Sequence, residues 1–300
     1  MKKKLKAAIV GLDTSHSVEF AKFMQDPSLP KEHQVGGMQV TRCLRFDTPF
    51  QSKEGLDKRQ AYLESIGVKV TQNFDEAVAD CDAIYLEIND PAYHLEYFKK
   101  CAVLGKPIFL DKPFADTLDS ANEIMAAAKE HNIRFFTASS LRYDANLIDA
   151  ASKCPRPQFA CIWGPLGKAP ASSSIVWYGV HAFEMLERTM GTGAVSVTAV
   201  PDRQGVVCTV AYADGRRGVV ELNSHSYRYG GVLRNAVPSE FLFHFVGGVD
   251  LYRSLIGEIQ RFFRGESGGV PLNESYEIMA MLEAADLSVK YGRTMPVYQN

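Results

Sequence analysis

The first half of the chain alternates short apolar runs with segments whose apolar residues recur at helical spacing. Parallel strands need crossover helices, so this alternation predicts a doubly wound parallel sheet. The run 83–88 is almost entirely apolar, as is typical of a strand buried on both faces. Asn73 and Glu76 form a capping-box pattern at the start of a short helix. Strands are expected at residues 5–10, 40–46, 83–88, 108–110 and 133–137, and helices at 17–24 and 118–128.

The pattern changes after about residue 147, where strands follow one another without crossover helices. They are expected at 159–163, 195–200, 206–212, 218–222 and 241–246, the last including the alternating Phe241, Phe243 and Phe245. Asp214-Gly215 is a hairpin signal between two of them. One helix is expected around 181–188, one at 251–263, and a last one that ends at Gly292. The prediction is an α/β protein with a Rossmann-type domain at 1–145, followed by an α+β domain at 146–300 with an open, mainly antiparallel sheet.

Charge and hydropathy exclude several classes of protein. The net charge of -2 gives no basic face for nucleic acid. No apolar run reaches the roughly 20 residues that span a bilayer, and the short basic segment before residue 7 leads into a first strand. The six cysteines are scattered, without the spacing of metal ligands, which suits free thiols in a reducing compartment. We therefore expect a cytoplasmic protein without a metal site.

The turn after the first expected strand reads Gly11-Leu12-Asp13-Thr14-Ser15-His16. A dinucleotide fingerprint has three glycines here: one for the turn, one for approach of the pyrophosphate and one for helix packing. Only the first is present, and a carboxylate at Asp13 would repel a pyrophosphate in the usual position. The helix N-terminus and the hydroxyls of Thr14 and Ser15 still offer donors to a phosphate. The alternative is an ordinary turn in which Asp13 caps the helix.

The second expected strand ends Arg45-Phe46-Asp47. An acidic residue at this point binds the ribose hydroxyls of NAD, whereas an arginine accommodates the 2′-phosphate of NADP. Both residue types are present, so the choice of cofactor stays open, with a slight preference for NAD.

Four further motifs complete the pattern. Asp111-Lys112-Pro113 follows a strand and is preceded by Gly105-Lys106-Pro107, and a proline-containing turn from Asn89 ends in His94. Residues 139–143 read Ser-Ser-Leu-Arg-Tyr, and residues 177–184 read Trp-Tyr-Gly-Val-His-Ala-Phe-Glu. Together they resemble the Gfo/Idh/MocA (glucose–fructose oxidoreductase / inositol dehydrogenase) family, in which Glu-Lys-Pro follows the fifth strand and Asp-x-Gly-x-His-x-x-Asp carries the candidate acid/base histidine.

The resemblance implies roles for individual residues. Lys112 would lie between nicotinamide and substrate, often with a cis bond to Pro113, and His181 would exchange a proton because an imidazole titrates near neutral pH. Substrate would be held by Arg142, Trp177, Tyr178 and Glu184. Cofactor would be held by Gly11, Asp13, Thr14, Ser15, His16, Asp47, Asn89, His94, Asp111 and Lys112. Trp177 and Glu184 both stand where the family has aspartates, which leaves the substrate contacts open.

The implied function is an NAD(P)-dependent oxidoreductase acting on a sugar, a polyol or a related hydroxy or keto compound. An NAD-dependent glycoside hydrolase is a second possibility, and a non-catalytic ligand-binding or regulatory homologue that has lost its cofactor is a third. The resemblance also implies a homodimer or homotetramer formed through the sheet of the second domain.

Overall fold

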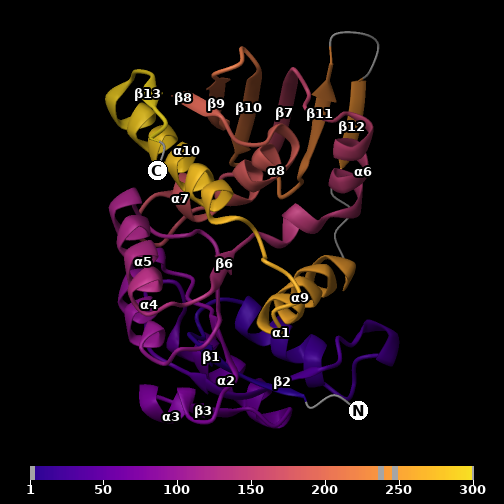
Figure 1. Ribbon diagram of the computed structural model, residues 1–300. Helices are drawn as coiled ribbons and strands as arrows, with labels where there is room; N and C mark the ends of the chain where they lie inside the picture. Colours follow the sequence, from indigo (N-terminus) through magenta and orange to yellow (C-terminus); the bar gives the residue numbers. More distant parts are fainter. Residues whose placement is uncertain (1–3, 236–239, 245–248, 299–300) are drawn as a thin grey trace. The chain divides into compact units, whose positions relative to one another are not determined.

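The computed structural model describes residues 4–235, 240–244 and 249–298 of the 300-residue chain. These residues form two compact units (Figure 1). The first consists of 4–115, 119–137 and 249–270, and the second of 116–118, 138–235, 240–244 and 271–298. This division differs from the expected boundary between residues 145 and 146, because the chain returns to the first unit after the strands of the second.

The first unit contains a six-stranded sheet in the order β3-β2-β1-β4-β5-β6, with every adjacent pair parallel. Chain order reverses between β1 and β4, which is the switch point where doubly wound sheets bind ligands. The strands are β1 (Leu5–Val10), β2 (Met38–Leu44), β3 (Lys69–Thr71), β4 (Ala83–Leu86), β5 (Ile108–Leu110) and β6 (Phe135–Thr137). The predicted parallel sheet is confirmed, and the short edge strand β3 was not predicted.

The helices of this unit are α1 (His16–Gln25), η1 (Lys31–His33), α2 (Lys53–Ser65), α3 (Phe74–Val78), η2 (Pro91–Tyr93), α4 (His94–Ala102), α5 (Leu118–Glu130) and α9 (Val249–Phe263). The predicted cap of α3 is confirmed, since the Asn73 side chain accepts a hydrogen bond from Glu76 N at 3.0 Å. The Glu76 carboxylate does not complete the box. It instead accepts hydrogen bonds from Thr71 and Lys69.

Helix α9 packs in the first unit, although the sequence suggested a place in the second domain. Its aromatic side chains explain this position. The Tyr252 ring lies edge-on to Phe20 of α1, with centroids 5.9 Å apart, and Phe262 lies against Phe136 of β6 at 4.8 Å. Ile259 is fully buried. Helix α9 thus lies beside α1 (Figure 1), and its apolar side chains complete the core of the parallel-sheet unit.

The second unit contains a seven-stranded sheet in the order β12-β11-β7-β10-β9-β8-β13. Every adjacent pair is antiparallel except β7 and β10. The strands are β7 (Phe159–Pro165), β8 (Ala194–Pro201), β9 (Gly205–Tyr212), β10 (Arg217–Asn223), β11 (Gly230–Arg234), β12 (Glu240–His244) and β13 (Met295–Pro296). This confirms the predicted mainly antiparallel sheet. Residues 245 and 246, including Phe245, lie outside the described residues.

The helices of the second unit are η3 (Ser140–Tyr143), α6 (Ala145–Lys153), α7 (Ser174–Trp177), α8 (Val180–Met190) and α10 (Leu272–Tyr291). Helices α6, α8 and α10 lie along one side of the sheet (Figure 1). Gly292 ends α10 in the left-handed conformation, at φ 63°, so the predicted C-cap is confirmed. The predicted hairpin at Asp214-Gly215 is also confirmed, because it joins the antiparallel strands β9 and β10.

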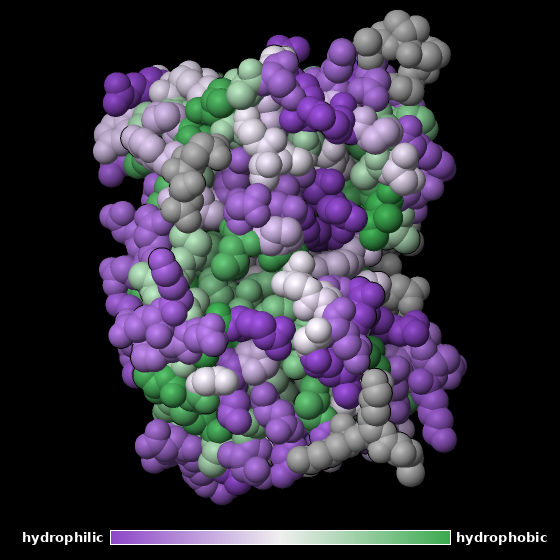
Figure 2. Space-filling model, in the orientation of Figure 1, coloured by the Kyte–Doolittle hydropathy of each residue, from purple (hydrophilic) through white to green (hydrophobic). Residues whose placement is uncertain are grey.

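None of the helices in the described parts of the chain is both long and apolar enough to span a bilayer. Over much of the face in Figure 2, hydrophilic residues surround smaller hydrophobic areas.

Candidate functional site

The turn after β1 keeps the first fingerprint glycine for a steric reason. Gly11 has a φ of +108°, and a Cβ atom there would lie 2.2 Å from the carbonyl oxygen of Glu87. Any side chain would strain the backbone and collide with the chain leaving β4. Gly11 N also donates to Leu44 O at 3.1 Å. The turn is therefore packed directly against the carboxyl ends of β2 and β4.

Asp13 occupies the position of the second glycine, and its side chain is 1% exposed. The hydroxyl of Thr48 donates to its Oδ2 at 2.7 Å, and Asn89 N donates to its Oδ1 at 2.8 Å. Burial raises the pKa of this carboxyl, and the hydrogen bonds from Asn89 and Thr48 oppose the rise. Asp13 thus joins the three loops that follow β1, β2 and β4.

Asp13 does not cap helix α1, so that alternative interpretation is wrong. The N-cap residue is Ser15, whose side chain makes no capping hydrogen bond. The hydroxyl of Thr14 accepts a hydrogen bond from His16 N at 3.3 Å, and the hydroxyl of Ser17 donates to Gly11 O at 3.0 Å. Thr14 is buried and Ser15 is exposed. The backbone N of His16 is thus bonded within the turn, at the helix end where an anion would approach.

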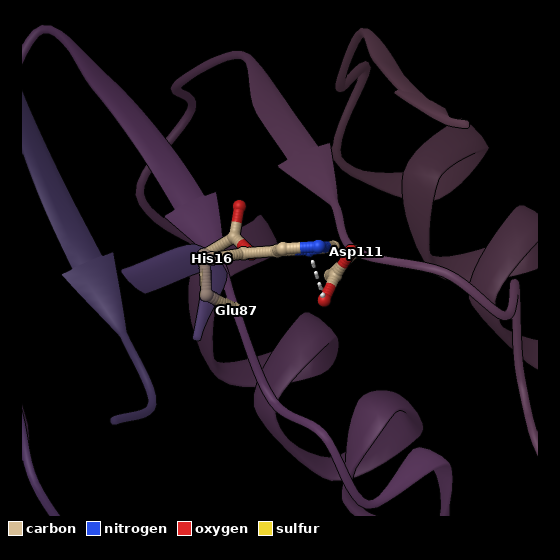
Figure 3. A group of neighbouring side chains, drawn as sticks. All are labelled: His16, Glu87 and Asp111. Carbon is tan, nitrogen blue, oxygen red and sulfur yellow. Dashed lines mark hydrogen bonds and ion pairs between the residues drawn. The ribbon is translucent and has the colours of Figure 1, made fainter. Parts of the chain in front are cut away.

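His16 occupies the position of the third glycine and directs its ring across the sheet edge. The ring stacks on Phe20, with centroids 5.3 Å apart and planes at 7°. Its Nδ1 lies 2.9 Å from Oδ1 of Asp111 and 3.1 Å from Oδ2 (Figure 3). His16 is only 6% exposed. A buried imidazole–carboxylate pair therefore links the start of α1 to the end of β5.

Glu87 directly follows β4 and lies beside this pair (Figure 3). It is fully buried, and its Oε2 lies 3.9 Å from Nδ1 of His16. Burial, and after it the Asp111 carboxylate, hold the pKa of Glu87 well above its usual value. Burial also favours the neutral form of Asp111, but His16 and Lys112 outweigh it and lower the pKa of Asp111. The two carboxyls therefore differ in charge state although they share one location.

Lys112 is 5% exposed, and its Nζ lies 3.8 Å from Oδ2 of Asp111. The backbone N of Lys112 donates to Oδ1 of the same carboxylate at 2.8 Å. The Lys112–Pro113 peptide is cis, as the resemblance predicted. A buried cation is thus held at the carboxyl end of β5, beside the end of β4.

The loop after β4 provides two of the predicted cofactor residues. Asn89 contacts Asp13 through its backbone N, and its side-chain amide donates to Asp13 O at 3.4 Å. His94 is fully buried, with Nε2 at 2.7 Å from Ile88 O and Nδ1 at 3.4 Å from Phe114 O. The His94 ring therefore joins two backbone segments, a structural arrangement for a residue predicted to bind cofactor.

The loop after β2 contains an exposed acidic residue and a largely buried arginine that is already paired. Asp47 is exposed. Arg45 is largely buried, and its guanidinium contacts Asp57 Oδ1 at 2.6 Å and Gln60 Oε1 at 2.7 Å. Because the donors of Arg45 are directed to α2, Asp47 is the more accessible of the two candidate ribose contacts.

In the second unit, His181 lies in the first turn of α8 and is 8% exposed. Its Nδ1 lies 2.7 Å from the hydroxyl of Ser139. The rings of Tyr178 and Tyr229 lie edge-on to the imidazole, with centroids at 5.2 and 5.9 Å. The hydrogen bond to Ser139 therefore helps to orient the ring, and two tyrosines confine it.

Arg142 is 6% exposed and pairs with Glu184, Glu187 and Glu274. Burial raises the pKa of Glu184 to about 7, against the opposing effect of Arg142. Glu184 also accepts a hydrogen bond from Ser139 N at 3.0 Å. The geometry brings Arg142 and Glu184 together in a buried ionic cluster within the second unit.

Trp177 and Tyr178 precede α8 and are both partly exposed. Their rings are tilted, with centroids 5.0 Å apart, and the Tyr178 side chain lies against Gly167. Nearby, the ends of β7 and β10 border a hollow of about 320 Å³ whose lining includes Gly167, Asn223 and Tyr227. The aromatic residues predicted to hold substrate therefore adjoin an open hollow of the second unit.

Sequence reasoning missed Glu87 and Ser139 as site residues. Glu87 was included in an apolar run, although an acidic residue at the end of a buried strand is itself a signal, because ionised carboxylates are costly to bury. Ser139 lay within a recognised motif but received no role.

The sequence of the first unit is similar to that of known proteins. Residues 5–139 match the model of the Gfo/Idh/MocA oxidoreductase family, described as having an NAD-binding Rossmann fold. An uncharacterized oxidoreductase of Streptococcus pneumoniae is 30% identical over 88 residues, and another, of Schizosaccharomyces pombe, is 28% identical over 148 residues. These alignments cover 29% and 49% of this chain, and 24% and 36% of the relatives.

Solved structures match the fold over almost the whole chain. Myo-inositol 2-dehydrogenase from Lactobacillus plantarum aligns with a TM-score of 0.78 at 15% identity, covering 99% of this chain and 100% of that one. Scyllo-inositol dehydrogenase from Lactobacillus casei, solved with NAD(H) and scyllo-inositol, aligns with a TM-score of 0.77 at 12% identity, covering 98% and 99%. At such identities the likeness establishes the fold alone. Residues 5–139 of this chain are therefore similar to the NAD-binding Rossmann domain of the Gfo/Idh/MocA family of oxidoreductases.

Proposed function

We propose that this protein is an NAD(P)-dependent oxidoreductase that acts on a hydroxyl or keto group of a sugar, a polyol or a related small compound. The observation that carries the proposal is the buried Lys112 at the carboxyl end of β5. Doubly wound sheets bind their ligands at this edge. A buried ammonium needs a partner; Lys112 pairs with Asp111 at 3.8 Å, and a substrate oxygen near the nicotinamide would be a second partner.

The turn after β1 fits a dinucleotide in part. Gly11 keeps the left-handed turn of the fingerprint, at φ +108°, and the N-terminus of α1 follows it. The Asp13 carboxylate is already bonded to Thr48 and Asn89. In this proposal the backbone around Thr14 and Ser15 holds the phosphates, and Asp47 contacts a ribose, which favours NAD over NADP. When bound, the nicotinamide supplies the hydride acceptor or donor.

The chain's own residues would bind and orient the substrate and move its proton. Lys112 would polarise the reacting oxygen, and His181, held by Ser139, would take up or return the hydroxyl proton. Trp177 and Tyr178 would offer ring faces to a sugar. We assign Arg142 and Glu184 a structural role in place of the expected substrate contact, because their charges are paired inside the second unit.

A second candidate function has a specific observation in its favour. Asp13 fills the position of the glycine that normally lets a pyrophosphate approach, and it is held there by two hydrogen bonds. A homologue that binds a different ligand, or regulates another protein, has no need for a pyrophosphate at this turn. Such a module would keep the fold without the hydride transfer.

Titration with NAD+, NADH, NADP+ and NADPH separates the two functions. We would follow the heat of binding and, in parallel, the fluorescence of Trp163 and Trp177. Saturable binding in the micromolar range, followed by NAD+ reduction with one member of a panel of inositols and hexoses, is the result expected of the oxidoreductase. Absence of binding for all four dinucleotides would leave the non-catalytic module.

We also propose that the protein assembles as a dimer or tetramer through the sheet of the second unit. Four large apolar side chains on its strands are at least one third exposed: Val195, Val200, Val207 and Leu242. Val200 and Val207 are cross-strand partners on β8 and β9, and contiguous exposed apolar area often marks a protein interface. Light scattering should give a mass of at least two chains, and Val200→Asp should reduce it to the 33.2 kDa monomer.

A further inference from the structure

Three potential metal ligands meet at the carboxyl edge of the parallel sheet (Figure 3). His16 begins α1, Glu87 follows β4, and Asp111 follows β5. All three are buried, and one ligand atom of each lies within 4.8 Å of the others. Nδ1 of His16 lies 2.9 Å from Asp111 Oδ1 and 3.9 Å from Glu87 Oε2. Segments separated by up to 95 residues thus direct one nitrogen and two carboxyl groups to one point.

Glu87 gives the cluster a property that an ordinary ion pair lacks. Its side chain is fully buried, and within the described residues no N–H or hydroxyl group donates to either of its oxygens, although the Asp111 carboxyl lies close enough to share a proton with it. The neighbouring carboxyls are satisfied, since Asp111 accepts from Lys112 N and Asp13 accepts from Thr48. A buried carboxyl without a donor is costly unless a proton or a cation neutralises it. The Glu87 side chain points into the cluster and leaves its oxygens available as ligands.

His16 is fixed in an orientation that suits a ligand. Its ring stacks on Phe20 and meets Tyr252 edge-on, with centroids 5.3 and 5.5 Å away. These contacts direct Nδ1 to the two carboxyls. The residue stands where the dinucleotide fingerprint has a glycine, so the side chain is an addition to that turn and not one of its standard parts.

We propose that His16, Glu87 and Asp111 bind one divalent transition-metal ion, such as Zn²⁺ or Mn²⁺. Imidazole nitrogen with carboxylate oxygen is a ligand set that these ions accept, whereas Mg²⁺ and Ca²⁺ prefer oxygen alone. With metal–ligand bonds of about 2.1 Å, ligand atoms around one ion lie roughly 3 to 4.2 Å apart. The separations of 2.9 and 3.9 Å lie in or close to this range, and the remaining pair, which lies within 4.8 Å, would have to close by up to about 1.4 Å around a tetrahedral ion.

The charges around the cluster agree with this assignment. Two carboxylates and the single Lys112 ammonium would leave a net charge of -1 when Glu87 is ionised, and a divalent ion would change this to +1. Asp13 adds a further buried carboxyl close enough to influence Glu87. A bound cation would therefore take the place of the proton that neutralises Glu87 while the site is empty.

The test uses the full-length protein without any dinucleotide, so that its result is independent of the proposed oxidoreductase function. Chelator-treated protein is titrated with Co²⁺ while the d–d absorption is recorded, and Zn²⁺ then competes for the site. We expect saturation at one ion per chain. Glu87→Gln, which keeps the shape of the side chain, should weaken Co²⁺ binding at least about tenfold, as expected for loss of a ligand.

Three further variants show whether a loss of binding reflects misfolding or a loss of surface binding. His16→Phe keeps the stacking on Phe20 but removes Nδ1, and it too should weaken binding at least about tenfold. His131→Ala and Glu54→Gln alter exposed residues and should leave binding unchanged. The proposal is overturned if wild-type protein shows no saturable binding, or if folded Glu87→Gln and His16→Phe bind Co²⁺ as tightly as wild type.

Discussion

The hydroxyl of Ser139 lies 2.7 Å from Nδ1 of His181, and both residues are buried. The same hydroxyl accepts a hydrogen bond from Leu141 N, and the backbone N of Ser139 donates to Glu184. One small residue thus fixes the start of η3 and the first two turns of α8. The orientation of the candidate acid/base histidine depends on this residue, which lies 42 positions earlier in the chain.

Replacing Ser139 with alanine should release the His181 ring. Loss of one buried hydrogen bond should lower the free energy of unfolding by about 1 kcal/mol. Long-range ¹⁵N–¹H NMR spectra should show a changed ratio of the two His181 tautomers, because Nδ1 loses its partner. Ser139→Thr keeps the hydroxyl and should retain the wild-type ratio. An unchanged tautomer ratio in Ser139→Ala would contradict the orienting role.

Local sequence was sufficient where burial alone decides the structure. The residues of β1 and β4 are mostly apolar because both faces of a parallel strand are covered, and both strands were predicted. Strand β11 was missed because Gly230 and Gly231 disfavour strands. These glycines are required by distant residues: a Cβ on Gly230 would lie 2.6 Å from the Trp163 ring, and one on Gly231 would lie 2.7 Å from Ile162. No local pattern records such a contact.

In the candidate site, too, features set by local sequence could be predicted, whereas contacts between distant residues could not. The residues of the turn and the position of Lys112 after β5 follow from motifs along the chain. The partners of Asp13 could not be predicted, because Thr48 and Asn89 are 35 and 76 positions away and lie on other loops. Sequence spacing also gave no indication that His16 and Asp111 would form a pair, since no pattern links residues 95 positions apart.

Asp13→Gly should show how the Asp13 carboxylate affects the stability of the protein and, separately, its affinity for NAD+. Removing the carboxylate leaves Thr48 and Asn89 without an acceptor, which should cost about 1 to 3 kcal/mol of stability. It also removes a negative charge near the expected pyrophosphate, so NAD+ should bind about tenfold more tightly, a gain of roughly 1.4 kcal/mol. Denaturant unfolding and calorimetric titration measure the two changes.

Asp13→Asn is the matched control, since it keeps one acceptor oxygen but no charge. It should retain more of the stability than Asp13→Gly and still tighten NAD+ binding. Weaker NAD+ binding in both variants would instead show that the Asp13 carboxylate takes part in holding the ligand.

Glu184 should make stability depend on pH around neutrality. Burial raises its pKa from 4.5 to about 7, so the folded protein holds this proton more tightly than the unfolded chain does. The resulting stabilisation is complete below about pH 4.5 and is lost as pH rises through about 7. The slope in that window is at most about 1.4 kcal/mol per pH unit. Glu184→Gln cannot ionise, so its stability relative to wild type should improve between pH 5 and pH 8 in denaturant unfolding. A constant difference across this range would rule out the raised pKa.

Lys112 and His181 should behave as parts of one catalytic unit if the protein is an oxidoreductase. Lys112→Ala removes the group proposed to polarise the reacting oxygen, and His181→Ala removes the proton carrier. Each should reduce kcat at least about a hundredfold, the usual effect of a lost acid/base group. The double variant should be little slower than either single variant, because the effects of groups that serve the same transition state are not additive.

The measurement is NAD+ reduction at saturating substrate, with Lys99→Ala as an exposed-lysine control that should keep wild-type turnover. Multiplicative losses in the double variant would show that the two residues act in separate steps, and full activity in either single variant would remove that residue from the mechanism.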